Sequence, residues 1–130
     1  MKTPKKEVII PEGGAPPLAP YSPGIRFGNL VYTSGQIGLD PKTGKLVSSS
    51  LEEEVRQAMV NLVKILDAAG SSLTQAIKIT VYIKDIADYP IVNRIYGEFF
   101  LKDPPARAII QGMLPAGASV EFDAVAFVTA

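Results

Sequence analysis

Residues 104–125 read PPARAIIQGMLPAGASVEFDAV, and this stretch predicts two apolar strands joined by a Pro/Gly turn. The first strand carries Arg107, and the second carries Glu121 and Asp123. A charge inside an apolar strand costs free energy unless it is paired or binds a ligand. We therefore expect the arginine and the acids either to pair across neighbouring strands or to face a shared cleft.

The composition limits the chemistry open to this chain. Its 130 residues predict a single domain over residues 1–130, which can bury roughly two thirds of its unfolded surface. The chain has no cysteine and no histidine, so it lacks thiolates, the commonest general base and the commonest transition-metal ligand. No phosphate-loop, dinucleotide-binding or metal-spacing motif is present in the sequence, so we expect no cofactor and no metal.

Charge and hydropathy indicate the compartment and the partners. Lys and Arg number 13, as do Asp and Glu, so the net charge of +0 makes nucleic acid an unlikely partner. The apolar run at residues 8–10 is far too short for a signal peptide, and no stretch approaches the roughly 20 apolar residues of a membrane span. We expect a cytoplasmic protein with no membrane partner.

The rest of the chain predicts an α+β fold with one mixed sheet covered by two helices. Helices are expected at residues 50–69, where Ser50 is the N-cap, and at 89–101, where Asp88 is the N-cap. The further strands are expected at 6–10, 25–27, 30–33 and 76–84, with Ile77, Ile79, Val81 and Ile83 on one face of the last. Because the strands are apolar on both faces, we expect a homo-oligomer packed sheet to sheet.

Three charged side chains are the first candidates for function. The planar guanidinium of Arg107 suits a carboxylate ligand, but an ion pair with Glu121 or Asp123 would also explain it. Glu121 and Asp123 are two residues apart on one strand face, where each raises the proton affinity of the other. They are either an acid/base pair or part of a solvated sheet edge.

Polar residues elsewhere leave similar alternatives. Without a histidine partner, Ser34 is not expected to be an activated nucleophile. The segment Ser34-Gly35-Gln36 either donates a hydrogen bond to a substrate or forms a strand-end turn. Tyr21 either lines a pocket or packs its proline-rich loop onto the domain, and Asn93 either bonds across a site or lies exposed. Tyr96 and its aromatic neighbours are interpreted as core residues.

Together these segments resemble the reactive intermediate deaminase family, the Rid or YjgF-like proteins. The resemblance covers residues 15–128 and depends on the order and spacing of many short motifs. The matching segments are Ala19-Pro20-Tyr21-Ser22, Gly28-Asn29, Thr33-Ser34-Gly35-Gln36-Ile37, Asp40-Pro41-Lys42-Thr43-Gly44, Val81-Tyr82-Ile83-Lys84-Asp85, Val92-Asn93, Tyr96, Phe99-Phe100, Pro105-Ala106-Arg107, Leu114-Pro115-Ala116-Gly117 and Val120-Glu121-Phe122-Asp123-Ala124.

The resemblance implies a chorismate-mutase-like fold and a homotrimer with an inner β-barrel and three clefts between subunits. It also implies a cofactor-independent deaminase that hydrolyses 2-imino acids, such as 2-iminobutanoate and 2-iminopropanoate, or their enamines, to 2-oxo acids and ammonia. By the same resemblance, Arg107 holds the substrate carboxylate and Glu121 orients the attacking water. Tyr21, Ser34, Gly35 and Asn93 would line the cleft.

Departures from the family pattern lie near the expected cleft. Ala19 replaces a usual glycine, Pro23 a common glutamine, and Ile109 a common cysteine. The segment from Arg107 to Pro115 is one residue shorter than usual, and we expect Gly112 to absorb the difference, because an uncorrected shift would invert the facing of the strand.

Other functions remain open at the level of sequence. One is a non-catalytic trimer that binds small carboxylates, such as 2-oxo acids, and regulates a partner. Another is an endoribonuclease or translation inhibitor, an activity ascribed to some relatives. A third is a deaminase for a different enamine.

Overall fold

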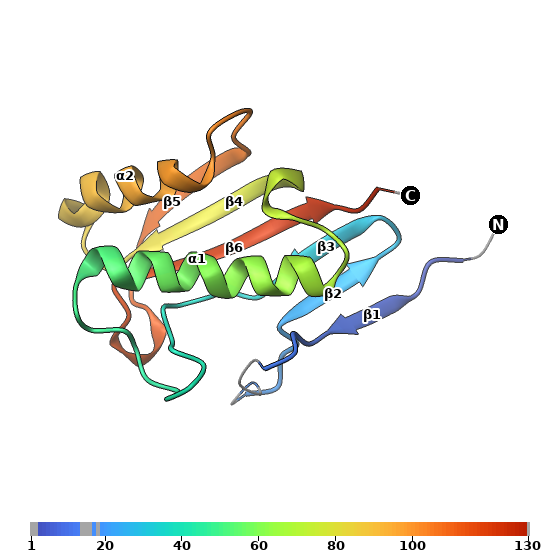
Figure 1. The fold of residues 1–130 in the computed structure, drawn as a ribbon, viewed down its shortest axis with the longest axis horizontal. Coiled ribbons are helices and arrows are strands. Elements are labelled where there is room, and N and C mark those ends of the chain that lie inside the picture. Colours follow the sequence, from blue (N-terminus) through green and yellow to red (C-terminus); the bar gives the residue numbers. More distant parts are fainter. Residues whose placement is uncertain (1–2, 14–16, 18, 130) are drawn as a thin grey trace.

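The computed structural model describes residues 3–13, 17 and 19–129, which form two layers, one of helices and one of strands (Figure 1). In chain order the elements are β1 (Lys6–Ile9), β2 (Gly24–Phe27), β3 (Leu30–Thr33), α1 (Leu51–Ala68), β4 (Ala76–Ile83), α2 (Tyr89–Phe99), β5 (Ala106–Gln111) and β6 (Val120–Phe127). Short 3-10 helices lie at Leu73–Gln75 (η1), Ile86–Asp88 (η2) and Pro115–Gly117 (η3). The predicted α+β fold is confirmed.

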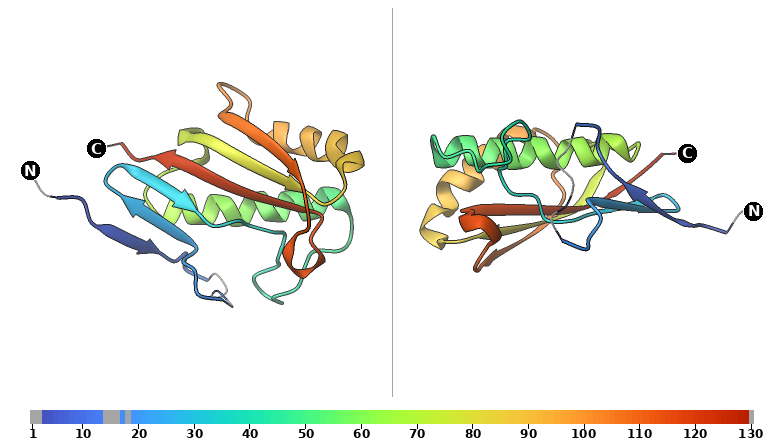
Figure 2. Two further views of the ribbon diagram at one scale, coloured as in Figure 1. Left: turned by 180° about the vertical axis from the view of Figure 1, so that it is seen from behind. Right: turned by 90° about the horizontal axis from the view of Figure 1, so that it is seen from below.

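The strands form one six-stranded sheet in the order β1-β2-β3-β6-β4-β5. β4 and β5 are parallel, and the other neighbouring strands are antiparallel. α2 supplies the crossover that a parallel pair needs. Both helices lie on one face of the sheet, as the edge-on view of Figure 2 shows. The expectation that the strands of Arg107 and Glu121 are neighbours is wrong, because β4 lies between them.

The core lies between the two helices and the covered face of the sheet. β6 alternates along its length, with one set of side chains buried and the other set partly exposed. The largest fully buried side chains include Phe122 of β6, Ile79 and Ile83 of β4, Met59 and Leu62 of α1, and Ile95 of α2. Burying such a side chain stabilises the fold by about 1.5–3 kcal/mol, so this layer holds the helices on the sheet.

Local chemistry explains where the helices begin. Ser50 caps α1, because its Oγ accepts a hydrogen bond from Glu53 N at 3.1 Å. Asp88 occupies the N-cap position of α2 as predicted, but its side chain makes no capping hydrogen bond. Asp85 instead accepts from Ala87 N at 3.0 Å and caps η2, which leads directly into α2.

Two further details differ from the expectation. Ile77 does not share the buried face of β4 and is 45% exposed, because the pairing with β6 shifts register between Ala76 and Lys78. α2 ends at Phe99 rather than at Leu101.

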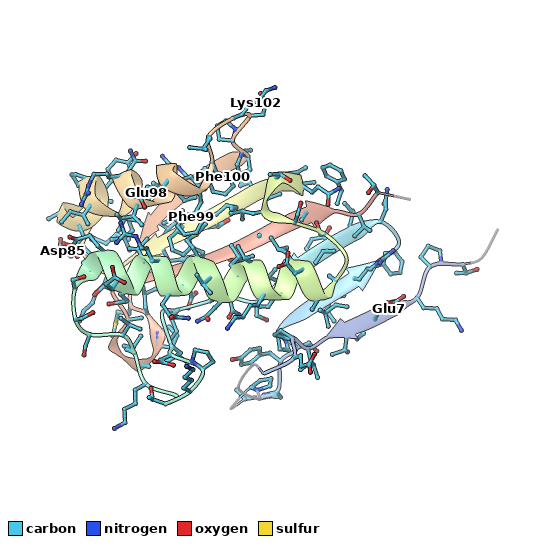
Figure 3. The ribbon with its side chains drawn as sticks, in the orientation of Figure 1. Glu7, Asp85, Glu98, Phe99, Phe100 and Lys102 are labelled. Atoms are coloured by element: carbon cyan, nitrogen blue, oxygen red, sulfur yellow. The ribbon has the colours of Figure 1, made fainter. Side chains whose placement is uncertain are left out.

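A salt bridge links the two helices. Arg56 Nη2 of α1 lies 3.2 Å from Glu98 Oε1 of α2, and Figure 3 labels Glu98.

Candidate active site

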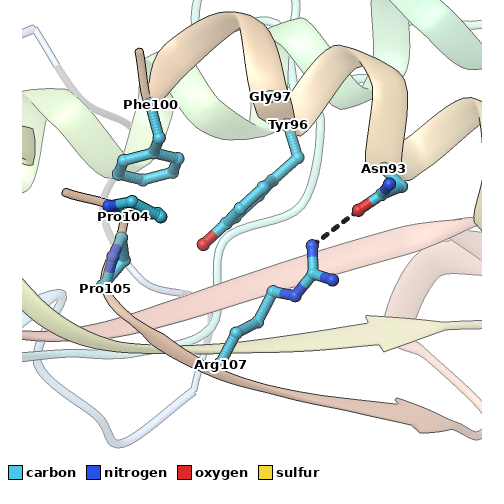
Figure 4. A pocket seen from close by; sticks show the side chains of 7 residues that line it. All are labelled: Asn93, Tyr96, Gly97, Phe100, Pro104, Pro105 and Arg107. Carbon is cyan, nitrogen blue, oxygen red and sulfur yellow. Dashed lines mark hydrogen bonds between the residues drawn. The ribbon is translucent and has the colours of Figure 1, made fainter. Parts of the chain in front are cut away.

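Arg107 projects from β5 toward one face of α2. Tyr89, Asn93 and Tyr96 are spaced four and three residues apart, so their side chains lie along the same side of the helix. Arg107 Nη1 donates to Asn93 Oδ1 at 2.8 Å, and Nη2 donates to the Tyr89 hydroxyl at 3.0 Å. Figure 4 shows the guanidinium reaching across to Asn93, beside the ring of Tyr96. Each terminal nitrogen is therefore fixed by a separate residue of α2.

The charge of Arg107 has only neutral partners. The guanidinium carbon lies 5.0 Å from the Tyr96 ring centroid and 5.8 Å from that of Tyr89, within range for cation–π attraction. Within the described residues, no carboxylate lies within salt-bridge distance of this side chain. The alternative of a structural ion pair with Glu121 or Asp123 is therefore wrong for the single chain. The charge of the anchored guanidinium is therefore available to bind an anionic ligand.

A pocket of about 380 Å³ lies beside this guanidinium, between α2 and the segment that leads into β5. Its floor is aromatic, because the Tyr96 and Phe100 rings pack with centroids 4.7 Å apart. Burial raises the pKa of Tyr96, although the positive Arg107 opposes the rise. The pocket is lined by Asn93, Tyr96, Gly97, Phe100, Pro104, Pro105 and Arg107 (Figure 4).

Glu121 lies on the other face of the sheet, which the helices do not cover. It alternates along β6 with the buried Phe122, and its partner on β4 is Tyr82. Burial raises the pKa of the Glu121 carboxyl, and the neighbouring Asp123 raises it further. Asp123 itself accepts a hydrogen bond from the Tyr82 hydroxyl at 2.9 Å. A carboxyl with a raised pKa, set beside a second acid, is suited to proton transfer.

The loop after β3 packs against Glu121. Gln36 N donates to Phe122 O at 2.7 Å, and Phe122 N donates back at 3.0 Å, so the loop runs along β6. Gly35 then faces the acid so closely that a Cβ at this position would lie 2.5 Å from Glu121 Oε2. A glycine at this position therefore leaves the Glu121 carboxylate in place, whereas any Cβ would displace it.

Ser34 and Tyr21 have more modest roles within one chain. Ser34 Oγ donates to Ser22 O at 2.5 Å and so ties the β3 end to the loop before β2. This contact matches the strand-end interpretation, although the hydroxyl oxygen remains able to accept a bond. Tyr21, one residue before Ser22, is 52% exposed and available at the surface.

The predicted site residues therefore form two half-sites on opposite faces of the sheet. Arg107 and Asn93 make one, on the helix side of the edge strand β5. Glu121 and Gly35 make the other, with Ser34 next to them in the chain. A single chain does not bring Arg107 and Glu121 together.

The comparisons with known proteins agree with this architecture. The family model described as Endoribonuclease L-PSP matches residues 13–128. The chain belongs to this family. The human 2-iminobutanoate/2-iminopropanoate deaminase is 44% identical over 110 residues, which cover 84% of this chain and 80% of that protein. The resemblance to Rid, YjgF-like proteins is confirmed.

Solved structures of this family superpose closely on the chain. The YjgF gene product of E. coli aligns with a TM-score of 0.88 and 34% identity, covering 93% of this chain and 98% of that one. E. coli TdcF with bound serine aligns with a TM-score of 0.89 and 31% identity, covering 95% and 99%. The predicted fold class is thereby confirmed.

The shorter segment between Arg107 and Pro115 does not disturb the half-site. β5 pairs with β4 in unbroken register from Ala106 to Gln111, and Gly112 N continues the ladder by donating to Ile83 O at 3.0 Å. The expectation that Gly112 absorbs the difference is wrong. The irregular backbone comes later, at Ala116 and Gly117, where φ is 57° and 73°.

Sequence reasoning missed two residues of the Arg107 half-site. The sequence predicts Tyr96 as a core residue, and its ring does pack in the core, but it also lies against the guanidinium of Arg107. Tyr89 was not a candidate, yet its hydroxyl holds Arg107 Nη2. The signal that could have found both is their helical spacing around Asn93.

The raised pKa of Glu121 predicts a pH-dependent cost to stability. The folded state binds this proton more tightly than the unfolded state, so the free energy of unfolding falls as pH rises from the ordinary carboxyl range through the folded pKa. We expect Glu121→Gln to raise the unfolding midpoint at pH 7 by a few degrees, and to lose this advantage at pH 4.

Thermal unfolding of both proteins across pH measures the effect. Glu7→Gln, on the exposed strand β1 (Figure 3), controls for loss of one negative charge. The prediction would be contradicted if Glu121→Gln raised the unfolding midpoint equally at pH 7 and pH 4. It would also be contradicted if Glu7→Gln raised the midpoint as much as Glu121→Gln does.

Proposed function

We propose that the protein is a cofactor-independent deaminase that hydrolyses 2-imino acids, such as 2-iminobutanoate and 2-iminopropanoate, or their enamine tautomers. The products are 2-oxo acids and ammonia, so the activity would remove reactive intermediates. The observation that carries the proposal is the guanidinium of Arg107, which Asn93 and Tyr89 hold in place and which no acid neutralises among the residues that the structure describes. The human relative carries the name of this activity, and TdcF binds serine, a small molecule with a carboxylate.

The proposed reaction needs little from the protein beyond positioning and proton transfer. One water adds to the C=N carbon, its oxygen becomes the oxo group, and its two protons leave with the nitrogen as ammonia. The imine carbon is already electrophilic, so the requirements are a fixed carboxylate, a placed water and a group that moves protons. Arg107 supplies the fork for the carboxylate, and Glu121 supplies the carboxyl that orients the water and transfers protons.

The complete site requires a second copy of the chain, and we propose a homotrimer with three clefts between subunits. The two half-sites lie on opposite faces of one sheet, so Glu121 of one copy would meet Arg107 of the next. The uncovered face of the sheet supports this assembly, because it exposes apolar side chains that a neighbouring sheet would cover. Tyr32, Ile77 and Ile110 are among the exposed large hydrophobic residues.

An imine-trapping assay tests the proposal. Threonine dehydratase turning over threonine releases 2-iminobutanoate, which semicarbazide traps. We expect the purified protein to lower the trapped imine and to speed the release of 2-oxobutanoate. Unchanged trapping would contradict deaminase activity and make carboxylate binding without catalysis the leading function.

The description of the family as an endoribonuclease supports a second test. The chain has no histidine and a net charge of +0, and both facts argue against cleavage and binding of RNA. We expect no RNA cleavage by the protein that is active on imines. RNA binding that weakens steeply with salt would instead support a nucleic-acid function.

The contact between Gly35 and Glu121 predicts a large effect of a single methyl group. A Cβ in Gly35→Ala would also lie 2.6 Å from Glu121 Cδ, so the carboxylate has to move. We expect kcat/KM for 2-iminobutanoate to fall at least about tenfold, because small misplacements of a catalytic group are costly. Gly112→Ala is the matched control, since no atom lies within 4 Å of a Cβ there. Equal activities of the two variants would contradict the prediction.

A further inference from the structure

Asp123 lies beside Glu121 on the face of the sheet that the helices do not cover. The two residues are two positions apart on β6, so their side chains point the same way and their Cα atoms are about 7 Å apart. Both residues are partly buried, so water shields their charges only in part. Two such carboxyl groups repel each other when both are ionised, and the charge of one therefore strengthens proton binding by the other.

The hydroxyl of Tyr82 distinguishes the two acids. Tyr82 of β4 is the ladder partner of Glu121, yet its hydroxyl donates to Asp123 Oδ2 at 2.9 Å. Burial raises the pKa of Tyr82, and the hydrogen bond to Asp123 raises it further, so the hydroxyl keeps the proton that it donates. This bond holds the Asp123 carboxylate beside Glu121, and it also takes the hydroxyl proton that could have stabilised an ionised Glu121.

The other groups around Glu121 do little to favour its ionised form. The loop at Ser34-Gly35-Gln36 has no ionisable side chain, and the donors of Ser34 and Gln36 bond to backbone carbonyls. Lys84, two residues beyond Tyr82 on β4, is exposed, so water weakens the effect of its charge. Burial raises the pKa of the Glu121 carboxyl, and Asp123 adds to the rise.

The proposed trimer would bring one further charge to Glu121, the guanidinium of Arg107 from the next copy. A nearby guanidinium favours the ionised form of a carboxyl group. The carboxylate of a bound substrate would neutralise that guanidinium. Asp123 then remains as the charge that acts on Glu121 during the reaction.

We propose that Asp123 is a positioning residue, whose negative charge keeps Glu121 protonated above the ordinary pH range of a carboxyl group, so that Glu121 begins each turnover as an acid. Glu121 gives its proton to the imine nitrogen, and water then adds to the carbon and gives one proton back to Glu121. Glu121 next protonates the amino group of the adduct. The C–N bond breaks with its electron pair on nitrogen, ammonia leaves, and the hydroxyl of the adduct becomes the oxo group as its proton returns to Glu121.

This inference rests on the proposed deaminase function and deepens it. The test compares the pH dependence of kcat/KM for 2-iminobutanoate between the unaltered protein and Asp123→Asn. The amide oxygen of asparagine can still accept the hydrogen bond from Tyr82, so the substitution removes the charge and keeps the contact. Ionisation of the imine itself affects both proteins equally, so a difference between the two profiles comes from the protein.

We expect the fall of kcat/KM at high pH to begin about one pH unit lower in Asp123→Asn than in the unaltered protein. At a pH above both transitions, kcat/KM of the variant should therefore be about tenfold lower, because a smaller fraction of Glu121 holds its proton. At a pH below both transitions, the two values should agree within about twofold. The unfolding midpoint and the assembly mass check that the structure is retained.

Two further variants separate the charge from its position. Asp67→Asn is the matched control, because Asp67 is exposed on α1, across the sheet from Glu121, and its loss removes the same charge. Its profile should match that of the unaltered protein. Asp123→Glu keeps a negative charge on the uncovered face and should restore the high-pH fall. An unmoved fall in Asp123→Asn, or a loss of activity that is equal at every pH, would overturn this inference alone.

Carbon-13 NMR of the side-chain carboxyl groups gives a second readout that needs no activity. We expect the Glu121 signal, assigned by its loss in Glu121→Gln, to titrate above the ordinary carboxyl range in the unaltered protein. Titration within the ordinary range would overturn the inference, and this measurement decides if Asp123→Asn changes the assembly mass. Failure of the unaltered protein to hydrolyse the imine at any pH would overturn the proposed function, and this inference with it.

Discussion

Arg107→Ala is expected to lower kcat/KM for 2-iminobutanoate at least about a hundredfold, because a guanidinium fork binds a carboxylate through two charge-assisted hydrogen bonds. The fold should survive the change, since Arg107 is exposed and its partners Asn93 and Tyr89 are neutral. Removing it leaves no buried charge unpaired. The semicarbazide assay measures the loss, with the unfolding midpoint and the assembly mass as checks on structure.

Two further variants sharpen this test. Arg107→Lys keeps the charge but loses the planar fork, so we expect activity between that of Arg107→Ala and that of the unaltered protein. Arg94→Ala is the matched control on α2, because the Arg94 side chain is 61% exposed and lies 4.0 Å from Glu52 in a surface ion pair. The turnover of Arg94→Ala should lie within about twofold of that of the unaltered protein. Full activity of Arg107→Ala would reject the role of Arg107 in binding the carboxylate.

The parts of the fold that follow from local chemistry could be predicted from the sequence. Ser50 begins α1 because its hydroxyl satisfies a free backbone N–H, and that information lies within four residues. The alternation of β6 follows from the two-residue period of a strand. These features depend on neighbours in the chain, so a pattern is enough to find them.

The order of strands in the sheet depends on distant residues, and there the sequence was insufficient. The turn after Gly112 indicated that β5 and β6 are neighbours, but the crossover through α2 places β5 on the far side of β4. The register shift that turns Ile77 outward also depends on the pairing of β4 with β6, so the alternating pattern of β4 alone does not predict it. The family resemblance identifies Arg107 and Glu121 as site residues, but their places on opposite faces of the sheet depend on the order and register of its strands.

Because Arg107 and Glu121 lie on opposite faces of the sheet, we expect two inactive variants to regain activity when their chains are mixed in one trimer. If Glu121 of one copy completes the site around Arg107 of the next, Arg107→Ala and Glu121→Gln each inactivate every cleft of a pure trimer. When the two chains are unfolded, mixed in equal amounts and refolded, a cleft is intact wherever the first variant supplies Glu121 and the second supplies Arg107. Random assembly of a cyclic trimer gives about a quarter of the clefts both native residues.

Recovered activity in the mixture is therefore expected at about a quarter of that of the unaltered protein refolded in the same way. A mixture of Arg107→Ala with Asn93→Ala is the control, because both changes affect the same half-site and each mixed cleft keeps at least one defect on the arginine side. Activity that stays at the level of the separate variants would mean that the two half-sites do not meet between copies. Arg107 and Glu121 would then act in separate sites, and the proposed cleft between copies would be rejected.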